Sequence, residues 1–179
     1  RKLGEQIGSN ESSIYRYFEN KHKLLLYLAS WYWGWLEYKT VFATNGIAEP
    51  WEKLLRAIEM LTQTVKEDVN FSHVNEVLLN RIVINEYSKA YLAKEVDQEN
   101  KEGYFVIYKR LVARLSEMIM SVDKTYPYPS SLASTILEGA LHQYFLQEHF
   151  PSLTNCNNEV SPTQYFTDLV FRTLKPTKL

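Results

Sequence analysis

The stretch from Leu3 to Leu25, LGEQIGSNESSIYRYFENKHKLL, has the pattern of two short helices joined by a tight turn, followed by a third helix that starts sharply at Lys21. Gly8 lies where the chain must turn, because glycine takes a left-handed backbone conformation without steric cost. Asn10 follows as a suitable N-cap, since its side-chain oxygen can accept from the free N–H groups of the next helix. The stretch predicts a helix-turn-helix, although an ordinary pair of helices at the edge of a bundle has the same pattern.

The outer surface of the second short helix is suited to a DNA groove. Ile14 and Phe18 are four residues apart and face inward, which leaves hydroxyl groups and a guanidinium outside. These groups can donate to phosphate oxygens, and Lys21 opens the third helix where a cation and free N–H groups can hold a phosphate together. We therefore predict DNA contacts from Ser12, Ser13, Tyr15, Arg16, Tyr17 and Lys21.

In register and without a gap, the stretch resembles the helix-turn-helix of the TetR family of bacterial transcriptional regulators. The matching residues are Leu3, Gly8, Ile14, Tyr15, Tyr17, Phe18, Asn20, Lys21 and Leu24. The chain departs from the family pattern at Gly4, Ser9, Asn10 and Glu19, which leaves its base preference open. The resemblance implies an all-α fold, with a helix-turn-helix DNA-binding head on a helical ligand-binding and dimerisation bundle.

The resemblance also implies a division of the chain. We expect residues 1–24 to form the back part of the DNA-binding head and residues 25–179 to form the all-helical ligand-binding and dimerisation domain. The family has a leading helix before the position of Arg1, so we expect only the full-length protein to bind a double-stranded DNA operator. The implied function is a repressor released by a small effector. An adaptor of the same fold without an effector is the main alternative, and a helical-bundle enzyme is a remote one.

Composition limits the class of protein. With 45% hydrophobic and 23% charged residues and only six each of Gly and Pro, the chain is expected to be globular and helical. Its net charge of −1 argues against a general nucleic-acid coat, whereas residues 1–24 hold five Lys or Arg against three Glu, a local excess of two positive charges. The single cysteine, Cys156, excludes an intrachain disulfide and suits the cytoplasm. No apolar run approaches the ~20 residues of a membrane span, so we expect no membrane partner.

Hydrophobic spacing beyond the motif predicts a series of helices and no strand. Asn45 and Gly46 should end the first long helix, and the segment Tyr126–Pro129 should break the chain because it contains two prolines. We expect the helix over about residues 74–94, the third of the series, to be buried on nearly every side, because apolar residues surround its axis. The expected helices are about 21–44, 50–68, 74–94, 97–122, 131–149 and 162–174.

The chain is rich in aromatic residues, with 13 Tyr, 8 Phe and 4 Trp. Buried tyrosine and tryptophan need polar partners, and so do the polar residues expected on the buried third helix. An aromatic cavity with a few polar groups meets both needs, although a tyrosine-rich core is the simpler alternative, and the resemblance implies a small-molecule pocket here. Its candidate residues are Trp31, Trp35, Asn80, Asn85, Tyr87, Tyr104, Tyr108 and His142, and the expected effector is a lipophilic or aromatic small molecule of unknown identity.

The expected helix over residues 131–149 carries an apolar face with small residues, and the last expected helix adds a second apolar face. Two chains can therefore form a four-helix bundle across a two-fold axis. The TetR family dimerises in this way. The candidate interface residues are Leu132, Ile136, Gly139, Ala140, Gln143, Phe166 and Val170. The alternative is that these helices close the core of a monomer.

No catalytic or metal-binding pattern is convincing. Glu138 and His142 are four residues apart on one helical face, but the paired Glu-x-x-His spacing of di-iron bundles is missing. Cys156 lies among polar residues in an expected loop, where it has no histidine partner in sequence. We therefore expect no enzyme activity, metal or cofactor.

Overall fold

The computed structural model describes residues 17–65 and 75–174, and this part of the chain is all-helical, without a strand. The elements are α3 (Lys21–Thr44), α4 (Pro50–Thr62), α5 (Glu76–Tyr91), α6 (Val96–Lys101), α7 (Val106–Val122), α8 (Pro129–His149), the short 3-10 helix η1 (Pro151–Leu153) and α9 (Pro162–Thr173). None of the described helices is both long and apolar enough to cross a membrane.

The helix α3 spans the range that the sequence predicts. Its N-cap is Asn20, whose side-chain oxygen accepts from the backbone N–H of Lys23 at 2.9 Å. Gly46 follows the end of the helix with a φ of 78°, a conformation that favours glycine. The helix crosses the expected domain boundary after residue 24 without a break, so the end of the motif and the body share one rigid element.

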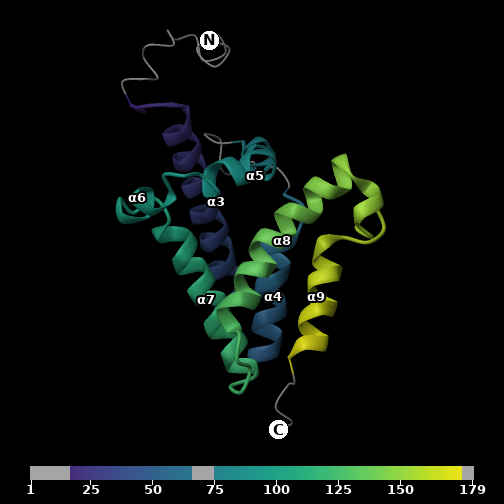
Figure 1. The fold of residues 1–179 in the computed structure, drawn as a ribbon. Helices are drawn as coiled ribbons and strands as arrows, with labels where there is room; N and C mark the ends of the chain where they lie inside the picture. Colours follow the sequence, from purple (N-terminus) through teal and green to yellow (C-terminus); the bar gives the residue numbers. More distant parts are fainter. Residues whose placement is uncertain (1–16, 66–74, 175–179) are drawn as a thin grey trace.

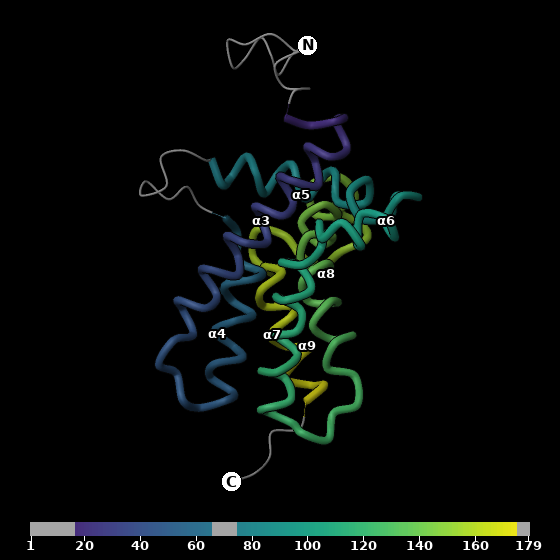
Figure 2. Tube along the Cα trace, turned by 90° about the vertical axis from the view of Figure 1, so that its left-hand side faces the viewer, coloured from purple at the N-terminus to yellow at the C-terminus, as the bar shows by residue number. Residues whose placement is uncertain are grey.

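The helices α3, α4, α7 and α8 pack into a bundle, and α9 packs against α4 and α8 (Figure 1). The turned view in Figure 2 shows α5 and α6 gathered at the end of the bundle where α3 begins. One continuous core joins all of these long helices. Its fully buried side chains include Trp33, Leu54, Ile58, Leu111, Leu115, Ile119, Ile136, Leu137 and Phe166.

The expectation of one long helix over residues 97–122 is wrong, because the chain forms α6 and α7 as separate helices. Gly103 lies between them with a φ of 91°, which a continuous right-handed helix does not allow. The apolar spacing on the two sides of Gly103 is compatible with one helix, so spacing alone did not reveal the break.

Two further expectations need correction. The helix α4 ends at Thr62, whose hydroxyl lies 3.0 Å from that of Thr163 on α9, and Gln63 after it is extended. The helix α5 is not buried all round, since Val77 and Leu78 are 37% and 56% exposed. Because α5 lies at the end of the bundle, α3 and α8 cover only one side of it.

Candidate functional site

The expected DNA-contacting residues fall at the edge of the described structure. Ser12, Ser13, Tyr15 and Arg16 lie outside the described residues. Tyr17 is 84% exposed, and Lys21 is exposed in the first turn of α3. These last two side chains are therefore accessible to a partner.

An ionic cluster fixes the first turn of α3 to α6. Glu99 is 1% exposed, and its carboxylate lies 2.9 Å from His22 Nε2 and 3.3 Å from Lys23 Nζ. Lys23 also donates to Glu102 at 2.8 Å. This hydrogen bond raises the pKa of Lys23 and lowers that of Glu102. The start of α3 is thus attached to the body by side chains that the sequence pattern did not single out.

A network of aromatic residues also connects α3 to α5, α7 and α8, further along α3 than the ionic cluster. Trp33 of α3 donates its indole N–H to the hydroxyl of Tyr91 on α5. Tyr91 stacks on Tyr87 with 4.7 Å between ring centroids and lies 5.5 Å from Tyr108 of α7. Tyr108 in turn donates its hydroxyl to Glu138 of α8. Four helices therefore meet through side chains that contact one another in series.

The tyrosines of this network are held neutral. Burial is the largest cause that raises the pKa of Tyr87, Tyr91 and Tyr108 well above the ordinary tyrosine value. Electrostatic interaction with Tyr108 and hydrogen bonding with Glu138 add to this effect at Tyr87. The hydroxyls of Tyr87 and Tyr108 thus interact with the carboxyl group of Glu138, while that of Tyr91 accepts from Trp33.

A cavity of about 560 Å³ lies beside this network, between α5 and α8. Three candidate ligand residues line it, namely Asn85, Tyr87 and His142, and Glu138 lies among them. Asn85 also lies 3.3 Å from the ring nitrogen of His149. The other lining residues are Ile84, Ser88, Leu92, Thr135, Gly139, Leu141 and Phe145. The structure thus brings part of the candidate set together around an apolar space with one acidic group.

The remaining candidate ligand residues lie elsewhere. Trp31 and Trp35 line a separate apolar groove on the outer face of α3, beside Ile107 of α7. Tyr104 packs at the start of α3, where Lys23 lies 4.5 Å from its ring centroid. Asn80 is half-buried on α5 and does not line the cavity between α5 and α8.

The candidate dimer residues lie inside the single chain. Leu132, Ile136, Ala140, Phe166 and Val170 are each no more than 7% exposed. They have almost no surface left for a second chain, because the apolar faces of α8 and α9 pack on each other and on α4. These five side chains therefore belong to the core of the single chain, and their part in an interface between two chains stays a prediction.

The other two candidate dimer residues also have partners within the chain. A Cβ built on Gly139 comes within 2.6 Å of Phe166 Cζ. Gln143 accepts from the Thr154 hydroxyl at 2.5 Å.

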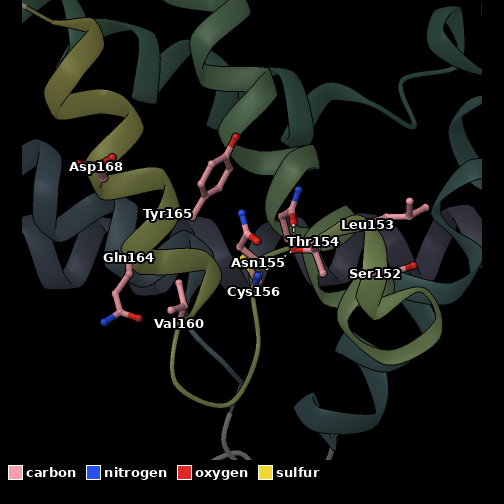
Figure 3. A pocket seen from close by; sticks show the side chains of 10 residues that line it. Ser152, Leu153, Thr154, Asn155, Cys156, Val160, Gln164, Tyr165 and Asp168 are labelled. Atoms are coloured by element: carbon pink, nitrogen blue, oxygen red, sulfur yellow. Dashed lines mark hydrogen bonds between the residues drawn. The ribbon is translucent and has the colours of Figure 1, made fainter.

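A second cavity, of about 550 Å³, lies where α8 connects to α9, and the sequence did not indicate it. Figure 3 shows Gln164, Tyr165 and Asp168 of α9 on one side of it and Thr154 on the connecting segment. Cys156 lines it as well but is only 5% exposed. The lining mixes polar and apolar groups and comes mainly from the connecting segment, so we place the candidate site at the more apolar cavity between α5 and α8.

The residues that sequence reasoning missed are Trp33 and Tyr91, together with the partnership of Glu138 with Tyr108. The spacing of Glu138 and His142 put both on one face of α8, and the structure places both at the cavity. In the described part of the chain, no three His, Cys, Asp or Glu side chains are grouped to hold a metal ion.

Comparison with known proteins does not add to this geometry. No protein-family model matches the chain, and no curated protein or solved structure is significantly similar to it.

Proposed function

We propose that the chain belongs to a DNA-binding transcriptional regulator of the TetR type, a repressor released by a small molecule. The observation that carries this proposal is the position of α3. The helix begins at Lys21, directly after the stretch that resembles the family's helix-turn-helix, and twelve residues later its Trp33 joins the aromatic network beside the cavity. One element thus connects the proposed DNA-binding residues with the proposed effector site.

The lining of the cavity narrows the class of effector. Among the described residues that line it, Glu138 is the one charged residue and there is no Lys or Arg. An anionic ligand would meet a carboxyl group there without a balancing cation, which is unfavourable at short distance. We therefore expect a neutral or cationic molecule with a lipophilic or aromatic body, of a size that fits about 560 Å³.

Release of DNA follows from displacement of the network. A ligand that enters between α5 and α8 pushes on Tyr87, which stacks on Tyr91, the hydrogen-bond acceptor of Trp33. Movement of Trp33 shifts α3 and with it the proposed head. In a pair of chains bound to half-sites about one helical turn apart, such a shift changes the distance between the heads.

The experiment uses the full-length protein. Lipophilic and aromatic compounds, both neutral and cationic, are screened for thermal stabilisation, and each compound that stabilises is added to the protein bound to labelled duplex DNA. The proposal expects stabilisation and DNA release together, with both lost in Thr135→Trp, which fills the cavity at an exposed lining position. Glu59→Trp on the exposed surface of α4 is the matched control. Release that persists in Thr135→Trp places the effector elsewhere.

The adaptor alternative predicts a different result in the same experiment. A full-length protein whose binding to DNA is neither specific nor sensitive to salt supports an interaction protein of this fold.

A further inference from the structure

The outer face of α3 carries an apolar seam that the described part of the chain covers only in part. Tyr27, Trp31, Gly34, Tyr38 and Val41 follow one another at intervals of four, three, four and three residues. This spacing places them on one line along the helix and is typical of a seam between packed helices. The four large side chains are 47%, 47%, 58% and 40% exposed, in chain order.

The seam forms one wall of a groove of about 420 Å³, and Ile107 of α7 contributes to the other wall. Gly34 lies at its middle, where a Cβ would make only ordinary contact with Ile107 at 3.8 Å. A second helix can approach closely at this glycine, because no side chain projects there.

The aromatic side chains of the seam are held in place within α3. Trp31 donates its indole N–H to the hydroxyl of Tyr27 at 3.1 Å. Tyr38 stacks with Phe42, which is 76% exposed, at a centroid distance of 6.4 Å. Such ordering lowers the entropy cost of docking a partner.

The seam and the neighbouring Phe42 expose a considerable aromatic area. An aromatic side chain offers roughly 200 Å², so partial exposure of Tyr27, Trp31, Tyr38 and Phe42 leaves roughly 450 Å² of aromatic surface on each chain. Two copies facing each other bury roughly 900 Å² from these residues alone, close to the roughly 1,000 Å² that a specific interface needs. An area of roughly 450 Å² lies in the range of the largest apolar patch on a typical monomer, and such patches are often functional.

The charged residues near the seam do not repel a second copy of the chain that binds there. Glu37 is the only acidic residue of α3, and it is paired with Arg110 at 2.5 Å and faces Arg114 at 3.6 Å. Lys39 lies 4.5 Å from the ring centroid of Trp35, at the edge of the seam. The seam itself is uncharged, so two identical seams can meet without burying like charges.

We propose that this seam is a self-association surface, at which α3 of one chain packs antiparallel to α3 of a second copy about a two-fold axis near Gly34. The antiparallel direction follows from the pattern, because large side chains flank Gly34 at similar distances on both sides. Tyr27 then lies near the partner's Val41, and Trp31 lies near the partner's Tyr38. This inference does not depend on the proposed DNA or effector binding.

Sedimentation over the micromolar to hundreds-of-micromolar range tests the surface. We expect a monomer–dimer equilibrium that Trp31→Glu weakens at least tenfold. Helical circular dichroism of this variant should be unchanged, because Trp31 is half exposed. Tyr165→Glu introduces the same change at an exposed aromatic residue of α9 and should leave the equilibrium as it was. A monomer at every concentration, or a dimer disrupted by Tyr165→Glu and not by Trp31→Glu, overturns the proposal.

Oxidative cross-linking tests the direction of packing. In a Cys156→Ala background, Gly34→Cys lies near the two-fold axis and should form a dimer disulfide readily. Phe42→Cys lies eight residues further along α3, so in antiparallel packing the two copies of this thiol are roughly 24 Å apart and should not cross-link. Equal cross-linking at both positions indicates parallel packing and contradicts the proposal.

Discussion

Gly139 of α8 lies directly against the ring of Phe166 of α9, so closely that a Cβ at residue 139 would be 2.6 Å from Phe166 Cζ. Phe166 is 2% exposed and has little freedom to move away. The small residue that suggested a contact between two chains therefore serves a contact between two helices of one chain.

Gly139→Ala should destabilise the protein. The added methyl group overpacks a closed contact, at a cost of about 1–3 kcal/mol in the free energy of unfolding. The better helix propensity of alanine offsets about 1 kcal/mol of this. Urea unfolding measures the balance, and Gly34→Ala is the matched control, because its Cβ has room and the change should be neutral or stabilising at concentrations where the chain is monomeric. A Gly139→Ala protein as stable as Gly34→Ala contradicts this account of the α8–α9 contact.

Alkaline pH should unfold the protein through its buried tyrosines. Burial raises the pKa of Tyr32, Tyr87, Tyr91 and Tyr108 above the value of about 10 expected in the unfolded chain. Above about pH 10 the unfolded chain loses protons that the folded chain keeps, so the free energy of unfolding falls as pH rises and is fully retained below that pH.

Tyrosinate absorbance and circular dichroism, followed together during a pH titration, check this expectation. The four buried tyrosines should ionise only with the loss of helical signal. Tyr108→Phe should lower by one the number of tyrosines that ionise only when the helical signal is lost. Ionisation of all 13 tyrosines with unchanged helical signal would show that the network is open to solvent.

Two lysines in the first turn of α3 should behave differently towards DNA. Lys21 is exposed, and its replacement by alanine should weaken DNA binding by the full-length protein and lower the salt slope by about one unit. Lys23→Ala removes the contacts with Glu99 and Glu102 and should loosen α6 from α3 while leaving the salt slope in place. Binding titrations at several salt concentrations measure both effects. An unchanged slope in Lys21→Ala removes this lysine from the proposed phosphate contacts.

Trp33 should report effector binding. It is 1% exposed and hydrogen-bonded to Tyr91, whereas Trp31 lies on the opposite, half-exposed face of α3. A compound that binds beside Tyr87 should therefore change tryptophan emission in the wild-type protein and in Trp31→Phe but not in Trp33→Phe. The sequence suggested Trp31 and Trp35 for this role, and a response carried by those residues would place the ligand in the groove on α3.

Local signals in the sequence predicted the ranges of α3, α8 and α9 closely. Asn20 and Gly46 mark the ends of α3 because capping and positive φ depend on the residue itself. Gly103 carried the same kind of signal, but the apolar spacing continued past it and concealed the break.

Contacts between residues that are far apart in the sequence were harder to predict. An apolar face on α8 or α9 looks the same whether it meets another chain or its own core, so Ile136 and Val170 could not be assigned from spacing. The contacts of Trp33 with Tyr91 and of Tyr108 with Glu138 join residues 58 and 30 positions apart, and no periodic pattern in one helix contains that information.

The central claim is that this chain is part of a sequence-specific DNA-binding protein, and selection of bound duplexes from a random DNA pool by the full-length protein tests it most directly. The account predicts enrichment of an inverted repeat with half-sites about one helical turn apart, bound with strong salt dependence. Tyr17→Ala should reduce this enrichment, while Tyr128→Ala, an exposed tyrosine at the start of α8, should not. A pool that stays random after repeated selection, or enrichment that is equal in both variants, would contradict the account.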